Sequence, residues 1–184
     1  WKIKVEKNGI SQTIDINSAG AFVFNKMDSK TVRFEWSDFS MLKNEAFKVA
    51  VTVKMEATSS LSNWNIGVSG MEGEELEHVV FPNIEYLKDM GNEELALPSW
   101  MGELVNNPRG DKEGGLKTYI LDYPGLMSMQ FLALYNKESY GLYAAADDTL
   151  GYSKQFVLKT DRDRYLNYHI VNFPASDTAL KSYV

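Results

Sequence analysis

The stretch Phe47-Lys-Val-Ala-Val-Thr-Val-Lys-Met55 decides the fold class of this chain. Its large apolar residues, Phe47, Val49, Val51, Val53 and Met55, occupy every second position. A helix would scatter these side chains around its circumference, whereas a strand places them all on one face. The pattern therefore predicts a β-strand with one face in a core.

The same alternation continues on both sides of this stretch. Val32, Phe34 and Trp36 alternate with charged residues, and the opening residues 1–5 alternate in the same way. Asn8-Gly9 separates that opening from a further alternating run, and an Asn-Gly pair in this position predicts a hairpin because both residues tolerate positive φ. Further strands are expected at 63–69, 75–81, 116–122, 126–135, 140–146, 154–160 and 164–173.

These elements predict an all-β architecture of about ten or eleven strands. For a chain of this length we expect a large two-sheet antiparallel β-sandwich rather than a barrel. We find no internal repeat and no interior linker, so residues 1–175 are expected to form one β-sandwich domain. Residues 176–184 are expected to begin a linker or helix toward a following domain, and 84–90 is the other helical candidate.

The composition narrows the possible chemistry. The chain has 184 residues, a formal net charge of -6, no Cys and only two His, His78 and His169. This inventory excludes disulfide scaffolds, zinc fingers and thiol nucleophiles, and we expect no metal site and no cofactor. The acidic balance argues against nucleic-acid binding, which needs a basic surface. No apolar run approaches the roughly 18 residues of a membrane-spanning helix.

The segment 83–115 is the long interruption of the strand pattern. It contains Pro98, Pro108 and several glycines, with little sustained alternation. Long loops in compact domains are commonly functional. Its stretch Leu97-Pro-Ser-Trp-Met-Gly-Glu-Leu-Val105 is apolar, so we expect this part to be packed down.

Six short motifs follow one another from about residue 60 onward: Trp64-Asn-Ile-Gly-Val68, Val80-Phe-Pro-Asn-Ile84, Leu97-Pro-Ser-Trp-Met-Gly102, Tyr123-Pro-Gly-Leu-Met-Ser-Met-Gln130, Gly141-Leu-Tyr143 and Asp147-Asp-Thr-Leu-Gly-Tyr-Ser-Lys154. Together they resemble the N-terminal β-sandwich of bacterial glycoside hydrolases in which a galactose-mutarotase-like supersandwich precedes a catalytic TIM barrel. The likeness is to gut-bacterial families related to α-galactosidases and endo-α-N-acetylgalactosaminidases.

The resemblance implies a non-catalytic domain of a carbohydrate-active enzyme. The acid and nucleophile carboxylates would then belong to a C-terminal catalytic domain of the same polypeptide, and carbohydrate would be the ligand of the parent enzyme. A secreted, periplasmic or cell-surface location is implied as well. The chain begins with Trp1 and its first methionine is Met27, so we expect a front domain cut from a longer protein.

Asp147 and Asp148 are the obvious candidates for carboxylate chemistry. Glycoside hydrolysis needs two carboxylates about 5–10 Å apart, one protonated and one ionised. Adjacent residues of an extended strand point to opposite faces, so these two cannot easily flank one bond. We therefore expect no catalytic residue in this chain and a turn role for the pair, with an Asx hydrogen bond to the backbone. Contact with a sugar, a partner domain or a cation is the alternative.

Trp100 and Tyr123 are the candidates for stacking on a sugar ring. Both lie beside turn-forming residues, Trp100 between Pro98 and Gly102 and Tyr123 before Pro124-Gly125. We nevertheless expect Trp100 to seal the loop against the core and Tyr123 to pack at a strand end, with stacking on a sugar as the alternative for both. Trp36 and Trp64 lie within strand patterns and are expected in the core.

Two other polar motifs are expected to be structural. Asp161-Arg-Asp-Arg164 lacks the spaced acidic ligands and Gly of a calcium loop, so it predicts a charged hairpin turn. His169 alternates with Asn167 and Val171 and is expected to lie within the final strand.

Three functions compete for this sequence. The first is an accessory sandwich of a glycoside hydrolase, and the second is an independent carbohydrate-binding module that uses Trp100 and Tyr123. The third is a surface β-sandwich with no enzymatic or sugar role. A free-standing mutarotase would need an acid–base pair, usually with His, and the two histidines lie in unpromising contexts.

Overall fold

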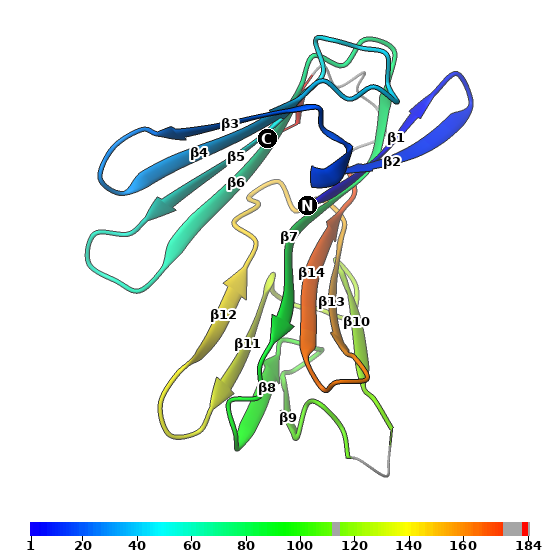
Figure 1. Ribbon diagram of the computed structural model, residues 1–184. Coiled ribbons are helices and arrows are strands. Elements are labelled where there is room, and N and C mark those ends of the chain that lie inside the picture. Colours follow the sequence, from blue (N-terminus) through cyan, green and yellow to red (C-terminus); the bar gives the residue numbers. More distant parts are fainter. Residues whose placement is uncertain (112–114, 175–181, 184) are drawn as a thin grey trace. The chain divides into compact units, whose positions relative to one another are not determined.

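The computed structural model describes residues 1–111, 115–174 and 182–183. The described residues form antiparallel β-sheets and one short 3-10 turn, η1 (Ile16–Ser18), without an α-helix, so the predicted all-β sandwich class is confirmed (Figure 1). The chain divides into two compact units. Unit 1 is Trp1–Phe81 with Pro174–Val184, and unit 2 is Pro82–Phe173.

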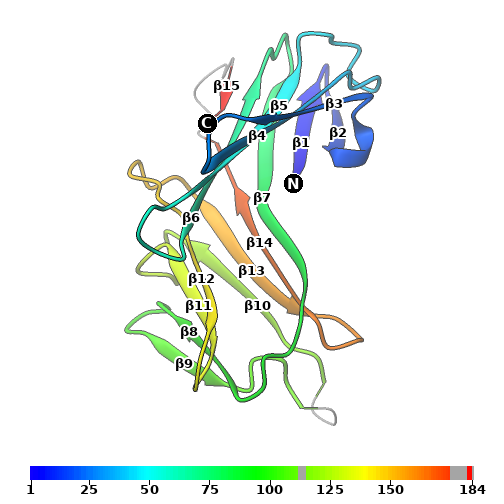
Figure 2. The ribbon, with the colours of Figure 1, turned by 60° about the vertical axis from the view of Figure 1, so that its left-hand side comes forward.

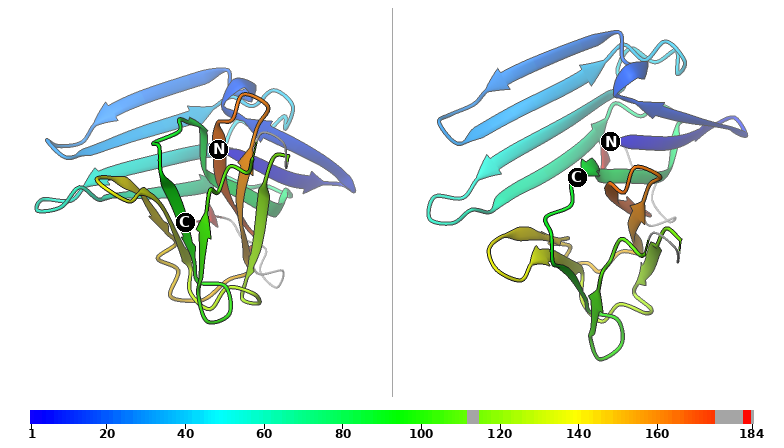
Figure 3. Two further views of the ribbon diagram at one scale, coloured as in Figure 1. Left: turned by 90° about the horizontal axis from the view of Figure 1, so that it is seen from below. Right: turned by 60° about the horizontal axis from the view of Figure 1, so that its bottom comes forward.

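The first layer of unit 1 is a five-stranded antiparallel sheet that contains the stretch quoted at the start. Its order is β15-β6-β5-β4-β3, with β3 (Ala21–Lys26), β4 (Thr31–Ser37), β5 (Lys48–Met55), β6 (Ser62–Ser69) and β15 (Ser182–Tyr183). Val49 and Val51 of β5 pair with Val68 and Ile66 of β6, and all four side chains are buried. Figure 3 shows the β3–β4 and β5–β6 hairpins, coloured blue to cyan-green.

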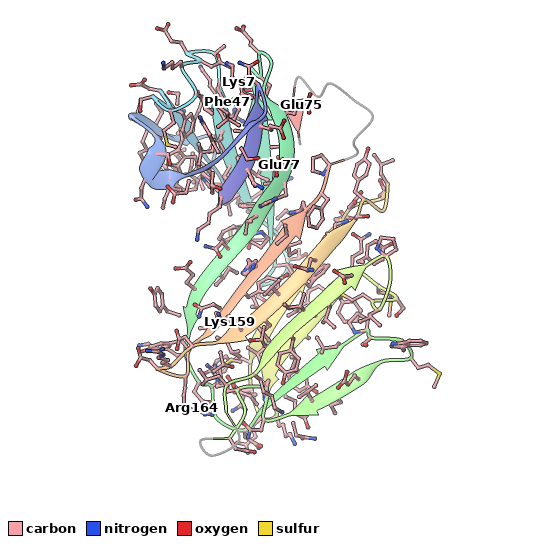
Figure 4. All side chains as sticks on the ribbon, turned by 90° about the vertical axis from the view of Figure 1, so that its right-hand side faces the viewer. Lys7, Phe47, Glu75, Glu77, Lys159 and Arg164 are labelled. Atoms are coloured by element: carbon pink, nitrogen blue, oxygen red, sulfur yellow. The ribbon has the colours of Figure 1, made fainter. Side chains whose placement is uncertain are left out.

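The second layer of unit 1 is built from β1 (Lys2–Lys7), β2 (Ile10–Asp15) and the first part of β7 (Glu75–Leu87). The predicted Asn8-Gly9 hairpin joins β1 to β2, and both turn residues have positive φ. Ile3, Ile14 and Val79 of this layer share one core cluster with the five-stranded sheet. Lys7 at the end of β1 and Glu77 on β7 are labelled in Figure 4.

Unit 2 is also a two-layer structure. One layer is β10 (Thr118–Tyr123), β13 (Lys154–Thr160) and β14 (Leu166–Asn172). The other is a four-stranded sheet of order β12-β11-β8-β9, made of β12 (Gly141–Ala145), β11 (Phe131–Asn136), β8 (Glu93–Leu97) and β9 (Glu103–Asn106) (Figure 2). Leu95, Leu132 and Leu134 from the four-stranded sheet meet Phe156 and Tyr168 from the other layer in one buried cluster.

The structure corrects the predicted helix at 84–90. Residues 84–87 belong to β7 instead. Tyr86 has a φ of 61°, and its N–H donates to Asn167 Oδ1 at 3.0 Å, so a side chain of β14 takes the hydrogen bond that a helix would have made within the segment. The other candidate, 176–184, lies outside the described residues except for 182–183, which form β15.

The described residues contain more strands than the sequence predicted, with 15 in all. The segment 83–115, expected to be irregular, contains the end of β7 and the whole of β8 and β9. Strand β3 was not predicted either, and every residue of it is exposed.

Trp64 corrects a further expectation, because 52% of its surface is exposed and it does not lie in the core. Trp64 is the last residue of the cross-strand row Lys26–Val32–Val53–Trp64. This row lies next to the rows of the five-stranded sheet whose side chains are buried. Trp36 is partly buried against the unit 1 core, as expected. No helix among the described residues has the length and apolar character needed to cross a membrane.

Candidate ligand-binding face

The outer face of the four-stranded sheet in unit 2 carries the candidate site. Alternate residues of β8 and β11, such as Leu95 and Leu134, point into the core, so the residues between them face away from it. One cross-strand row of outward residues runs Leu104–Ala96–Ala133–Tyr143. The two alanines form a low floor between a leucine and a tyrosine, both of which are exposed.

A groove of about 430 Å³ opens at the Trp100 end of this face. We call it the Trp100 groove; it is lined by Ala96, Leu97, Pro98, Trp100, Met101, Gly102, Glu103, Leu104, Ser128, Met129 and Phe131. The side chain of Trp100 is 76% exposed, and Met101 is fully exposed. Phe131 packs against Tyr143 with the rings tilted by 31° and their centroids 5.8 Å apart, which continues the aromatic surface across the sheet.

The backbone on both sides of Trp100 is fixed by hydrogen bonds. Trp100 N donates to Leu126 O and Ser128 N donates to Pro98 O, each at 2.8 Å. Gly102 N donates to Ser99 O at 2.8 Å, which closes the turn between β8 and β9. Trp100 has a φ of 53°, so it sits in the left-handed region at the turn. The expectation that this segment is packed down is wrong for most of it: Leu97 and Pro98 are buried, but Trp100, Met101 and Leu104 are exposed, so the indole does not seal the loop against the core.

A polar row lies next to the apolar row on the same face. It consists of Asn106, Glu94 and Tyr135, two residues along each strand from Leu104, Ala96 and Ala133. Tyr135 Oη donates to Glu94 Oε2 at 2.9 Å, and Lys137 Nζ lies 2.7 Å from Glu94 Oε1.

Lys137 keeps the carboxyl of Glu94 ionised. Its hydrogen bond to this carboxyl, helped by that of Tyr135, holds the pKa of Glu94 below its usual value. Lys137 Nζ also donates to Asn106 Oδ1 at 3.3 Å. Lys137 therefore neutralises the one charge of this row, that of Glu94.

A second hollow, of about 380 Å³, adjoins this polar row. We call it the amide pocket; it is lined by Asp89, Gly91, Asn92, Glu93, Asn106, Asn107, Pro108, Arg109 and Lys137. Arg109 in its wall is committed to structure, because its guanidinium donates to Glu93 and to three backbone carbonyls. Asn106 belongs both to the pocket and to the polar row, and Lys137 of the pocket pairs with Glu94 of that row, so the two features are continuous.

Tyr123 and Asp148 form a separate cluster around the buried Lys154. Lys154 Nζ lies 2.6 Å from Asp148 Oδ2 and 5.2 Å from the centroid of the Tyr123 ring. The carboxylate of Asp148 also accepts the backbone N–H groups of Leu150, Gly151 and Tyr152. The predicted Asx turn is therefore confirmed for Asp148.

The electrostatics of this cluster hold Asp148 ionised. Burial raises the pKa of the Asp148 carboxyl, but the hydrogen bonds from Lys154 and from the backbone outweigh it, and the net pKa lies below the ordinary value. A carboxylate fixed in its charged form cannot act as a proton donor at neutral pH. Asp147, beside it, is exposed.

The structure thus brings only part of the predicted site together. Trp100 lies in the Trp100 groove, whereas Tyr123 and Asp148 share the Lys154 cluster and do not line that groove. The sequence did not single out Ala96, Glu94 or Asn106. The signal that could have found Glu94 and Ala96 is the alternation Glu94-Leu-Ala-Leu97, which places a charged and a small residue on the face opposite two leucines.

The remaining polar motifs are structural, as expected. Asp161 Oδ1 accepts the N–H groups of Asp163 and Tyr165, which makes the charged turn between β13 and β14. Arg164 at this turn is labelled in Figure 4. His169 lies within β14. Within the described parts of the chain, no cluster of three or more metal-ligating side chains occurs.

Known proteins offer no guide to the ligand of this face. No family of known proteins matches this chain, and no curated protein matches its sequence.

Proposed function

We propose that this chain is a non-catalytic β-sandwich of a carbohydrate-active enzyme, a glycoside hydrolase, which packs on and supports a catalytic TIM barrel. The observation that carries the proposal is the outer face of the four-stranded sheet, where Trp100, Met101 and Leu104 are exposed on a hydrogen-bonded framework. Exposed apolar patches of this kind mark interaction sites. The motif resemblance described above supplies the enzyme class and implies a secreted, periplasmic or cell-surface setting.

The ionised form of the candidate carboxylates favours a non-catalytic role for this chain. A glycosidase needs one carboxylic acid that remains protonated to donate to the leaving group. Asp148 and Glu94 both have lowered pKa values, because each is held by a lysine. Neither can serve as that acid at neutral pH.

A paired activity assay tests the proposal. Residues 1–184 alone and the longer parent protein are incubated with a panel of chromogenic α- and β-glycosides. We expect turnover by the parent and none by residues 1–184. Turnover by residues 1–184 alone, or an inactive parent, would overturn the proposal. The sequence after Val184 offers an independent check, since alternating strands and helices over about 250 residues would indicate a TIM barrel.

A second candidate function, an independent carbohydrate-binding module, is favoured by one specific observation. Trp100 presents a largely exposed indole inside a groove, and the flat face of an indole suits stacking against the apolar face of a sugar ring. This candidate predicts that residues 1–184 bind sugars without any neighbouring domain. The accessory role alone does not require such binding.

A further inference from the structure

We infer that the outer face of the four-stranded sheet binds a neutral oligosaccharide along β8 and β9, with one ring stacked on Trp100 and the hydroxyls of another unit in the amide pocket. This inference rests on the carbohydrate-active function proposed above and names the ligand class and its direction on the sheet. It is argued from the continuity of the two hollows, their contrast in chemistry and their charge balance.

The Trp100 groove and the amide pocket are joined by the same two strands. Leu104 lines the groove and Asn106 lines the pocket, and they are two residues apart on β9, or about 7 Å. On β8, Glu93 at one end lines the pocket and Leu97 at the other end lines the groove, about 13 Å apart. An extended ligand can therefore follow the strands from one hollow to the other.

The two hollows offer complementary chemistry. The groove presents an indole, a phenylalanine and two methionines, which suit the C–H face of a pyranose ring. The pocket is lined by Asn92, Asn106 and Asn107, and a side-chain amide can both donate and accept hydrogen bonds. Lys137 already donates to Asn106 Oδ1 and Asn107 already donates to Asp111, which leaves Asn106 its N–H groups and Asn107 its carbonyl oxygen. Sugar hydroxyls have the same dual character. An apolar face of a protein partner would match the groove but would leave the amide pocket unused.

The charges of the face favour a neutral ligand. Glu94 is paired with Lys137, and Glu93 is paired with Arg109. Asp89 of the pocket and Glu103 of the groove add two further carboxylates, so the face carries more negative than positive charge and disfavours a phosphate or a uronic acid. Neutral hexose and pentose oligosaccharides are the chemical class that remains.

Binding is tested with residues 1–184 and a panel of trisaccharides built from glucose, galactose, mannose and xylose. Isothermal titration measures affinity, and tryptophan fluorescence reports stacking. We expect at least one trisaccharide to bind more tightly than about 1 mM. Trp100→Ala should weaken that binding about tenfold or more, and Asn106→Ala should weaken it roughly threefold to tenfold. Trp100→Tyr, which keeps a stacking ring, should restore most of the loss.

Two control variants keep the test specific. Trp64→Ala removes another exposed tryptophan, in unit 1, and Asn25→Ala removes an exposed amide on β3. Both should bind as the unaltered chain does. Because Trp100 is largely exposed, its replacement should leave the thermal unfolding midpoint unchanged, which excludes misfolding as the cause of any loss.

Failure of the inference and failure of the proposed function give different results. If no trisaccharide binds, or if Trp100→Ala binds equally well, the inference is overturned whatever the parent enzyme hydrolyses. If Trp100 becomes shielded from acrylamide quenching in the parent while no sugar binds, the face belongs to a neighbouring domain and the inference is again overturned. If binding follows the predicted variant pattern but the parent hydrolyses no glycoside, the inference stands and the proposed function fails.

Discussion

Arg109 and Glu93 form a two-point ion pair in the interior of unit 2, with Nε 2.6 Å from Oε2 and Nη2 2.8 Å from Oε1. The side chain of Arg109 is only 1% exposed. Its remaining N–H groups donate to the carbonyls of Leu87, Lys88 and Arg164, so the guanidinium joins the end of β7, the start of β8 and the β13–β14 turn. This residue organises the local fold rather than binding a ligand.

Replacing Arg109 by Met should therefore destabilise unit 2 strongly. The substitution leaves Glu93 buried without its charge partner, and removing one member of a buried pair costs about 3–5 kcal/mol. Chemical denaturation followed by circular dichroism measures the loss. Arg162→Met replaces an exposed arginine of the β13–β14 turn and is the matched control; it should change the free energy of unfolding by less than about 0.5 kcal/mol.

A double variant, Arg109→Met with Glu93→Leu, separates the charge effect from the loss of the carbonyl bonds. Removing both charges should recover part of the stability, because no uncompensated carboxylate remains. If the double variant is as unstable as Arg109→Met alone, the cost lies in the three carbonyl contacts, and the charge argument is wrong.

Gly70 should be intolerant of any side chain. It has a φ of 72°, and a Cβ there would lie 1.8 Å from the carbonyl oxygen of Ala46. The backbone cannot move away freely, because Asn44 Nδ2 donates to Gly70 O at 2.9 Å and Asn44 also holds the buried Glu74. We expect Gly70→Ala to cost about 3 kcal/mol or more in the free energy of unfolding.

Gly73 supplies the control for this prediction. It also has a positive φ, 82°, but no atom lies within 4 Å of the Cβ position. Gly73→Ala should therefore cost only the left-handed backbone penalty, about 1–2 kcal/mol. Equal losses for the two variants, measured by urea denaturation, would show that the close approach to Ala46 has no energetic weight.

The features that the sequence predicted are those set by local pattern. Alternation was sufficient for β5 and β6, and the Asx turn at Asp148 could be predicted because its partners are backbone groups a few residues away. Strand β8 was missed because Glu93 and Glu94 are charged residues in a buried strand. Their partners, Arg109, Tyr135 and Lys137, lie far along the chain, so no short window contains the reason for their burial.

The candidate face was only partly predictable for the same reason. The exposure of Trp100 follows from a turn whose bonds reach across to Leu126, which a linear pattern does not show. The floor formed by Ala96 and Ala133 depends on the register between β8 and β11. The division into two units could not be predicted from the sequence either, because the boundary after Phe81 lies inside strand β7 rather than in a linker.

Asp148→Asn should destabilise the chain at neutral pH and lose its effect in acid. The pKa of Asp148 is lowered in the folded state, so its carboxylate contributes stability above the unfolded value of 3.8, and this contribution disappears as the pH falls through the folded pKa. At pH 7 the variant leaves the buried Lys154 without its anion, at a cost of about 2 kcal/mol.

Thermal unfolding across pH 7 to pH 2.5 measures this dependence. The difference in midpoint between Asp148→Asn and the unaltered chain should be constant near neutrality and should shrink below pH 3.8. Asp147→Asn changes an exposed neighbour of the same type and should show no difference at any pH. A gap that persists at the lowest pH would mean that the carboxylate charge is not what holds the turn.

Tyr168→Phe should leave the stability of unit 2 unchanged or raise it by about 1 kcal/mol. The phenolic oxygen of Tyr168 is buried and has no hydrogen-bond partner among the described residues, and burial raises its pKa far above the usual value. Removing a buried, unsatisfied hydroxyl removes a desolvation cost, while the ring still fills the core.

Tyr135→Phe is the matched comparison, because its hydroxyl donates to Glu94 at 2.9 Å. Here the same chemical change removes a hydrogen bond to a carboxylate, so the free energy of unfolding should fall. Urea denaturation of both variants gives the sign of each change. If Tyr168→Phe lowers stability as Tyr135→Phe does, the buried hydroxyl of Tyr168 must have a bonding partner in solution, and the core around it is not purely apolar.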